Sequence, residues 1–219
     1  MGKHVDLTDS YNSLIEALDH AGIINKAKVN LTFIDAAKIN KSNVKKKLSF
    51  ADAVLVPGGF GERGSEGKIA AIKYARENKI PYFGICFGMQ LAVIEMARNI
   101  LGIQDANSSE FSNCNNSIVG LMTEWTTSDN TTEKRSKNDD LGGTMRLGSY
   151  EAKLRKGSKI YNIYKDEIIN ERHRHRYEVN NKFAEEFENK GVIFSGYSPD
   201  GLLPETVELK DHPWFIGVQ

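Results

Sequence analysis

The residue pattern best suited to chemistry is a cysteine set between two glycines, in Gly84-Ile85-Cys86-Phe87-Gly88-Met89-Gln90. It follows a short apolar run and precedes a helical pattern, so Cys86 stands at a turn from a strand into a helix. The backbone at such a turn is strained, and Gly84 and Gly88 relieve the crowding around it. The pattern matches the nucleophile elbow G-x-S-x-G with cysteine in place of serine, in which the following N–H, here that of Phe87, helps to hold an oxyanion. Cys86 is therefore a candidate nucleophile.

The helix that follows Cys86 bears on the reactivity of its thiol. The positive N-terminal end of a helix stabilises a thiolate, so we expect a thiol pKa below the free value of about 8.5. The competing interpretation is that Cys86 is a small buried hydrophobic residue at a strand end. The two flanking glycines and the helix favour the nucleophile.

A glycine-rich loop, Pro57-Gly58-Gly59-Phe60-Gly61, follows the apolar run Ala53–Val56. In α/β folds, the loops at the ends of adjacent strands converge where ligands bind. The glycines allow a main-chain N–H of this loop to approach a group bound at Cys86 closely. This N–H would supply a second oxyanion donor opposite that of Phe87.

The same loop resembles two nucleotide-binding motifs. Residues 59–64 match the dinucleotide fingerprint G-x-G-x-x-G, but the next strand ends in Cys86 where an acidic residue should bind the ribose. A P-loop is also excluded, since Gly67-Lys68 is followed by Ile69 and no glycine stands five residues before Gly67. Neither dinucleotide binding nor nucleotide hydrolysis is indicated.

The composition excludes several classes of protein. The 219 residues, 40% of them hydrophobic, suffice for one α/β domain. Lys plus Arg and Asp plus Glu both number 29, so no net charge attracts nucleic acid or an anionic membrane. The stretch Arg172–Tyr177 is basic, but in a strand its arginines face one way and its histidines and tyrosine the other. Two cysteines, no signal peptide and no long apolar stretch predict a cytoplasmic protein.

Helical and extended patterns alternate along the chain, as expected for a mostly parallel sheet covered by helices on both faces. We predict helices at 8–22, at about 66–78, after Cys86 and at 182–189. In the helix after Cys86, residues Met89, Ala92, Val93, Met96 and Ile100 form the predicted core stripe. Strands are predicted at 29–35, 53–56, 81–85, 145–154, 168–179, 192–198, 205–209 and 214–218, with a turn at Pro199-Asp200-Gly201.

Residues 126–140 contain no apolar side chain. They cannot contribute burial that offsets the entropy of ordering them. We therefore predict a mobile surface loop at 126–140 within a single domain that spans residues 1–219.

Taken together, these motifs resemble those of class I glutamine amidotransferases, and among them those of the glutaminase domain of CTP synthases. The resemblance covers essentially the whole chain. It is carried by the loop 57–61, the elbow 84–90 and the stretch 107–111, and most specifically by Asp140-Leu141-Gly142-Gly143-Thr144-Met145-Arg146-Leu147-Gly148 and by residues 171–180, Glu-Arg-His-Arg-His-Arg-Tyr-Glu-Val-Asn. The fold that it implies is a flavodoxin-like three-layer sandwich.

The resemblance also implies a reaction and its residues. The thiolate of Cys86 would attack the side-chain amide of L-glutamine, expel ammonia and leave a thioester that water hydrolyses. The oxyanion would lie on the N–H groups of Gly59 and Phe87. By position, Gln90, Glu110 and Arg176 match side chains that bind the amino-acid end of glutamine.

The same resemblance implies a larger enzyme. Ammonia would serve the amination of UTP to CTP on a separate synthetase domain that uses ATP and Mg²⁺, in a homotetramer that GTP activates. The loop Gly61–Gly67 is a candidate contributor to GTP binding, and the glutaminase domain itself would need no cofactor or metal.

The resemblance further implies that the chain is truncated at both ends. In the family, the last strand continues from a position equivalent to Gln219 into F-H-P-E, whose His and Glu are the general base and its partner. The five histidines here are His4, His20, His173, His175 and His212, and none matches that base. We expect His212 to be structural. Without the base, a factor of about 10²–10⁴ in rate is lost, so the chain should bind glutamine better than it hydrolyses it.

Two other functions remain open at this point. One is a non-catalytic binding or assembly module in which Cys86 is structural. The other is a cysteine hydrolase of γ-glutamyl compounds on the same fold, which the motifs at 140–148 and 171–180 disfavour. Selective labelling of Cys86 by a glutamine analogue would distinguish a glutaminase from the binding module. Ammonia production from free glutamine would distinguish a glutaminase from the hydrolase of γ-glutamyl compounds.

Overall fold

The computed structural model describes residues 1–3, 8–111, 116–121, 124–126, 132–134 and 145–219. Its largest element is a seven-stranded sheet. In spatial order the strands are β1 (Val54–Val56), β2 (Tyr82–Ile85), β12 (Phe215–Val218), β11 (Pro204–Leu209), β10 (Val192–Tyr197), β7 (Arg146–Leu154) and β8 (Ile168–His175). Two smaller sheets pair β3 (Asn107–Ser108), β4 (Ser117–Leu121) and β9 (Tyr177–Val179), and β5 (Glu124–Thr126) with β6 (Thr132–Lys134).

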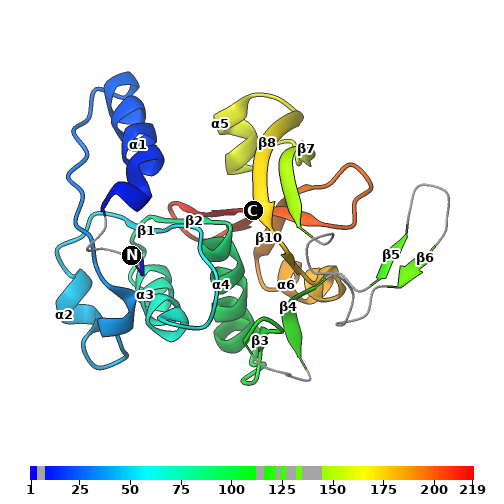
Figure 1. Cartoon of the computed structure of the whole chain (residues 1–219), viewed down its shortest axis with the longest axis horizontal. Coiled ribbons are helices and arrows are strands. Elements are labelled where there is room, and N and C mark those ends of the chain that lie inside the picture. The colour runs from blue at the N-terminus through cyan, green and yellow to red at the C-terminus, as the bar shows by residue number, and fades with distance from the viewer. Residues whose placement is uncertain (4–7, 112–115, 122–123, 127–131, 135–144) are drawn as a thin grey trace.

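The helices lie on both faces of the large sheet (Figure 1). One face carries α3 (Ser65–Glu77), α4 (Phe87–Met96) and α6 (Ala184–Glu188), and the other carries α5 (Lys159–Tyr164). Two further helices are α1 (Asn12–Ile24) and the short α2 (Val44–Leu48). The described residues also form 3₁₀ turns at Thr8–Tyr11, Ala36–Lys38 and Asn181–Phe183 and a π turn at Ala97–Leu101. No helix within the described ranges is long and apolar enough to cross a lipid bilayer. The expected three-layer α/β architecture is confirmed.

The sheet is less parallel than the sequence predicts. Only the β1–β2 and β2–β12 pairs are parallel, and the pairs from β12 to β8 are antiparallel. Strands β10, β11 and β12 follow one another through short connections, which permit antiparallel neighbours only. The turn at Pro199–Gly201 joins β10 to β11 as predicted.

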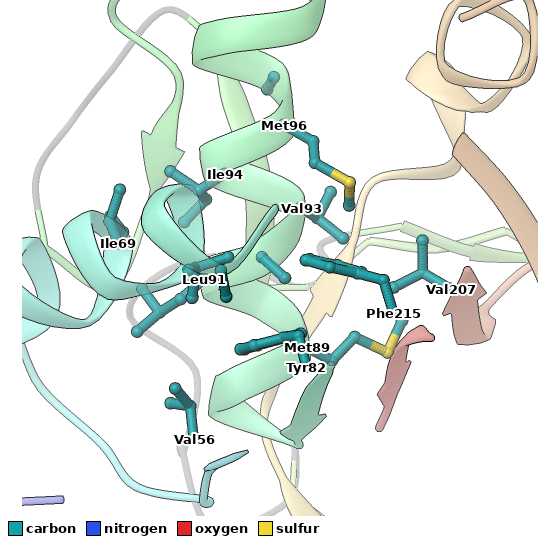
Figure 2. Packing of buried hydrophobic residues seen from close by; sticks show 14 of the residues in the cluster. Val56, Ile69, Tyr82, Met89, Leu91, Val93, Ile94, Met96, Val207 and Phe215 are labelled. Carbon is teal, nitrogen blue, oxygen red and sulfur yellow. The ribbon is translucent and has the colours of Figure 1, made fainter. Parts of the chain in front are cut away.

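Helix α4 is buried on every side (Figure 2). Met89 and Val93 face Phe215 of β12, while Leu91 and Ile94 face Ile69 of α3. The predicted stripe is buried except at Ile100, which is half-buried in the π turn beyond α4. It is only part of the buried surface, because α3 covers another face of the helix.

A buried ion pair joins α3 to α4. Glu95 is fully buried, and both of its carboxylate oxygens accept hydrogen bonds from Arg76 at 2.8 Å. A two-bonded guanidinium–carboxylate contact fixes geometry as well as charge. The two helices are thereby held in register behind the elbow.

The predicted strand at 29–35 is wrong. This segment is extended but makes only one bridge, a parallel one between Asp35 and Gly2. No strand of the described sheet lies next to it, since β1 is the edge strand, and its apolar side chains Val29, Leu31 and Phe33 are exposed. Without a backbone partner, the segment forms no ladder.

The predicted loop at 126–140 falls mostly outside the described residues. Thr126 and residues 132–134 are described, and they take part in the antiparallel β5–β6 pair. Residues 127–131 and 135–140 lie outside the described ranges.

Candidate active site

Cys86 lies at the junction of β2 and α4 with φ 51° and ψ −105°. A positive φ at a non-glycine residue costs about 1–3 kcal/mol and persists only where the surroundings enforce it. The Cys86 N–H donates to Val218 O of β12 at 2.6 Å, and Cys86 O accepts from the N–H of Gln90 at 3.0 Å. The backbone on both sides of the cysteine is thus fixed in the elbow geometry that the sequence predicts.

The two glycines of the motif are required by close packing. A Cβ at Gly88 would lie 2.1 Å from Val56 O, and one at Gly84 would lie 2.7 Å from the backbone carbon of Gly88. Both distances are too short for any side chain. The prediction that Gly84 and Gly88 relieve crowding is confirmed, and the neighbour that crowds Gly88 is β1.

The glycine loop after β1 reaches the same edge of the sheet as Cys86. Because β1 and β2 are parallel, their carboxyl ends lie side by side. A Cβ placed on Gly58 would lie 3.7 Å from the Cβ of Cys86, and one on Gly59 would lie 3.7 Å from the ring of Phe87. The predicted convergence of these two loops is confirmed.

The thiol of Cys86 differs from the expectation. Burial raises its pKa to about 11, the Phe87 N–H lowers it, Glu178 and Glu110 raise it further, and Lys68 lowers it. The prediction of a pKa below the free value is therefore wrong for this state of the site. The sequence pointed to the helix end but could not reveal the desolvation, which outweighs it.

Lys68 is a site residue that the sequence analysis passed over. Its side chain is 1% exposed, and its Nζ lies 4.7 Å from the ring centroid of Phe87 and 3.7 Å from a Cβ placed on Gly59. Burial lowers its pKa to about 8, and the charge of Lys3 acts in the same direction. A signal was present, because Lys68 falls on the same face of α3 as the buried Ile72 and Ala75.

Glu110 joins the glycine loop to the turn after β3. Its Oε1 accepts a hydrogen bond from the N–H of Gly61 at 2.6 Å. Burial raises the carboxyl pKa, while this hydrogen bond and the charge of Lys3 lower it. Lys3 Nζ in turn donates to Gly61 O at 2.8 Å. Glu110, predicted from a distant part of the chain, is therefore brought to the loop beside Cys86.

Gln90 and Arg176 lie on the two elements that close the site from the other side. Gln90 is buried in the first turn of α4, and its Nε2 donates to Tyr177 O of β9 at 2.8 Å. Arg176 is half-buried at the bend between β8 and β9, directly before Tyr177. The Gln90–Tyr177 hydrogen bond thus fixes the strand that carries Arg176 against the helix that follows Cys86.

The basic stretch 172–177 is not a basic surface. His173 and His175 are buried, and Arg172 and Arg174 are exposed on the opposite face, as the alternation predicts. The pattern breaks at Arg176, where the chain leaves the large sheet. The two histidines hydrogen-bond each other at 2.9 Å, and burial lowers their pKa values to about 4 and about 3.

These histidines belong to a buried charged cluster. Arg146 donates to Glu205 at 2.8 Å and to Glu178 at 3.3 Å, and all of these side chains are buried. Burial raises the pKa of Glu178 to about 8. Arg146 comes from the 140–148 motif and Glu178 from the 171–180 motif, so the two motifs meet in this cluster.

Among the described residues, no histidine hydrogen-bonds the sulfur of Cys86. His212 is buried near the opposite end of β12, where Nδ1 accepts from the N–H of Trp214 at 3.2 Å, consistent with its predicted structural role. His4 lies outside the described residues. Because Cys86 N–H bonds to Val218 O, the carboxyl end of β12 is the backbone closest to the elbow on that side.

The chain was compared with known proteins. The profile of the family described as "Glutamine amidotransferase class-I" matches residues 6–219. CTP synthases of Paramagnetospirillum magneticum and Pelagibacter ubique are 58% and 59% identical over 219 residues, and the chain spans 40% of the length of each.

Two solved structures are also similar to this chain. One titled "Trypanosoma brucei CTPS - glutaminase domain with bound acivicin" matches with a TM-score of 0.86 at 35% identity, covering 100% of this chain and 82% of that one. A putative GMP synthase subunit from Thermoplasma acidophilum, at 14% identity and a TM-score of 0.54, shares the fold alone. From the family profile, these relatives and the cysteine elbow, the chain belongs to the class I glutamine amidotransferase family.

Proposed function

We propose that this domain hydrolyses L-glutamine to glutamate and ammonia through a thioester on Cys86. The observation that carries the proposal is the elbow: a cysteine at φ 51° between β2 and α4, with the Phe87 N–H at its sulfur and the glycine loop of β1 alongside. Sγ forms a bond to the amide carbon of glutamine, the carbon–nitrogen bond breaks, and the nitrogen leaves as ammonia with the thiol proton. Water then cleaves the thioester.

The oxyanion of each tetrahedral intermediate would lie between the N–H groups of Phe87 and Gly59. These donors belong to two neighbouring loops that follow two parallel strands, and a Cβ placed on Gly59 would lie 3.7 Å from the Phe87 ring. Backbone donors held in this way need no reorganisation when charge develops, and losing one typically costs about 10²–10³ in rate. The ammonium of Lys68 behind Gly59 and Phe87 favours negative charge in the same place.

Glutamine has two charges at its amino-acid end, and the chain offers a group of opposite sign for each. The carboxylate of Glu110 would bind the α-ammonium, and the guanidinium of Arg176 would bind the α-carboxylate. Gln90 supports Arg176, because its Nε2 donates to the carbonyl oxygen of the next residue, Tyr177. A substrate that carries both an α-ammonium and an α-carboxylate is thereby distinguished from a neutral amide.

The raised thiol pKa means that attack requires a base. At neutral pH a thiol of pKa about 11 is protonated, and proton removal must accompany attack. We infer that this base acts from the side of the elbow that β12 covers, where the Cys86 N–H bonds to Val218 O.

The ammonia would be used by a second unit. We propose that it aminates UTP to CTP in a synthetase domain, since the relatives are CTP synthases and the chain spans 40% of their length. ATP and Mg²⁺ would act in that domain, and GTP and a homotetramer belong to the same proposal. The glutaminase step uses only side chains and backbone of this domain.

Covalent labelling tests the glutaminase proposal. The protein is incubated with a diazoketone analogue of L-glutamine and then examined by intact mass and peptide mapping. One adduct on Cys86, prevented by excess L-glutamine and absent in Cys86→Ala, is expected, while Cys114 stays unmodified. Labelling of Cys114 but not of Cys86, or labelling that glutamine does not slow, would show that Cys86 is structural and the domain a binding module.

A further inference from the structure

The charged residues proposed to recognise glutamine belong to the small sheet β3–β4–β9, whereas Cys86 follows a strand of the large sheet. Glu110 comes shortly after β3, and Arg176 directly precedes β9. Strand β4 joins the two, since it pairs with β3 on one side and with β9 on the other. The distance from Cys86 to these charged groups therefore depends on how the small sheet is held against the large one.

Three consecutive residues hold the chain where it enters β9. Arg176 is the proposed partner of the α-carboxylate of glutamine. The next carbonyl oxygen, that of Tyr177, accepts a hydrogen bond from Gln90 of α4 at 2.8 Å. The third residue, Glu178, accepts a hydrogen bond from Arg146 of β7 at 3.3 Å. Strand β9 is thus tied to the helix behind Cys86 by a main-chain oxygen and to the large sheet by the side chain of Glu178.

Arg146 is itself fixed on several sides. Its Nη1 also donates to Glu205 of β11 at 2.8 Å, and its guanidinium carbon lies 4.4 Å from the ring centroid of Tyr150. The side chains of Arg146, Glu178 and Glu205 are all buried, so solvent screens their contacts little. A contact with Arg146 therefore positions β9 against a rigid part of the large sheet.

The side chain of Glu178 is directed toward this anchor by the strand geometry. Its backbone pairs with Gly120 of β4, and by alternation its side chain lies on the other face of β9 from Val179, which is buried in the main core. Glu178 Oε1 accepts from Arg146 and also lies 3.4 Å from His175 Nδ1. Within the described part of the chain, Oε2 has no hydrogen-bond partner. The link to the large sheet is therefore made through Oε1.

We propose that Glu178 is a positioning residue for glutamine: through Arg146 it holds the bend that carries Arg176 at the distance from Cys86 that the length of glutamine requires. The inference rests on the proposed function, which supplies the roles of Cys86 and Arg176. Without the Arg146 contact, β9 keeps its ladder with β4 and its bond to Gln90, so the fold persists while the bend is held less firmly. A displacement of about 1 Å is enough to weaken the positioning of a substrate substantially.

The test measures how well L-glutamine protects Cys86 from the diazoketone at pH 7. Glu178→Met has no acceptor for Arg146, and the glutamine concentration that gives half-protection should rise about tenfold. The labelling rate at saturating diazoketone should change by less than about threefold, because the elbow is intact. Glu178→Gln keeps an oxygen that can accept from Arg146, so it should restore protection to within about threefold of wild type.

Glu205→Met is the matched control. Glu205 bonds to the same guanidinium and is buried to the same degree, but β11 carries none of the residues proposed to bind glutamine. Its replacement should lower stability and leave half-protection within about twofold of wild type. This difference between two partners of one arginine separates a positioning role from a general loosening of the cluster.

Alkylation by iodoacetamide, which has no amino-acid end, reports on the elbow alone. Burial raises the pKa of Glu178 to about 8, so at pH 7 its carboxyl group mostly holds a proton and its replacement changes the charge near Cys86 little. The alkylation rate should therefore be the same in wild type and in all of the variants. Should Glu178→Met not fold, Glu178→Asp takes its place, because it keeps the carboxyl group but is one methylene too short to reach Arg146.

Three results would overturn the proposal. The first is wild-type protection by glutamine in Glu178→Met, or in Glu178→Asp where that variant replaces it. The second is a loss of protection in Glu205→Met as large as in Glu178→Met. The third is an equal slowing of iodoacetamide and diazoketone in Glu178→Met, which would place the defect in the elbow. Labelling of wild-type Cys86 that glutamine does not slow would instead overturn the proposed function, and this inference with it.

Discussion

Replacing Lys68 by methionine should make the protein more stable and Cys86 less reactive. Lys68 is 1% exposed, and burial lowers its pKa from 10.5 to about 8. That difference corresponds to about 3 kcal/mol of unfavourable free energy in the folded state below pH 8. Methionine has a similar shape and no charge, so the variant does not carry this unfavourable free energy. Loss of the contact between the ammonium and the Phe87 ring should destabilise the variant by about 0.5–2 kcal/mol. The net gain at pH 7 is about 1–3 kcal/mol.

The gain should depend on pH with a definite sign. A lysine with a lowered folded pKa is destabilising while it is charged in both states, so the difference between variant and wild type is largest below about pH 8. Between pH 8 and 10.5 the unfolded chain binds more protons than the folded one, and the wild type recovers the difference as pH rises.

Urea unfolding at pH 7 and pH 10 measures this effect, with Lys73→Met as the matched control. Lys73 is on the same helix but 41% exposed, so its replacement should change stability by less than about 0.5 kcal/mol. Labelling of Cys86 by the diazoketone should be slower in Lys68→Met, because the ammonium lowers the thiol pKa. Two results would refute this reasoning. One is a Lys68→Met protein that is less stable than wild type at pH 7, and the other is a gain in stability over wild type that is the same at pH 7 and pH 10.

Three further predictions follow from the described contacts. In Gly88→Ala, the new Cβ would lie 2.1 Å from Val56 O and force a shift of about 1 Å, so scanning calorimetry should show a loss of about 1–3 kcal/mol and Cys86 labelling should vanish. In Gly58→Ala the new Cβ would lie 3.7 Å from the Cβ of Cys86, an ordinary contact distance, so stability should be kept; equal stability of the two variants contradicts the packing argument. Arg146→Met removes the guanidinium that bonds to Glu178 and Glu205 and should cost about 3–5 kcal/mol in urea unfolding at pH 7.5. Burial raises the pKa of both carboxyl groups, that of Glu178 to about 8, so the loss should shrink as the pH falls to 5 and Glu205 also binds a proton; a loss that does not depend on pH is the contrary result. Alkylation of Cys86 by iodoacetamide should rise about tenfold per pH unit from 7 to 9 without levelling off, and a plateau near pH 8.5 would mean an ordinary thiol.

Local patterns predicted the elbow and most of the elements around it. The glycines at 84 and 88, the apolar runs of β1 and β2 and the helix after Cys86 are each set by a few neighbouring residues, and each was predicted within a residue or two. The convergence of the 58–61 loop with Cys86 followed from one topological rule for parallel strands.

The predictions that were wrong or incomplete concern features that depend on contacts between distant parts of the chain. The strand at 29–35 needs a partner on its edge, and no local pattern reveals whether one is present. The thiol pKa depends on how deeply β12, α4 and the glycine loop bury the sulfur. The helical spacing puts Lys68 on the buried face of α3, but only the packing of that face against Phe87 makes it part of the site. The roles of Gln90, Glu110 and Arg176 came from resemblance and stay predictions.

In the proposed reaction Cys86 accepts the γ-glutamyl group of glutamine, and an acid-quenched digest tests this directly. The protein is mixed with L-glutamine, quenched in acid within the first turnovers, digested, and the peptide that contains Cys86 is weighed by mass spectrometry. A γ-glutamyl thioester on that peptide, absent with D-glutamine and in Cys86→Ala, is the predicted result. Release of glutamate and ammonia with no adduct on Cys86, or with undiminished release in Cys86→Ala, would contradict it.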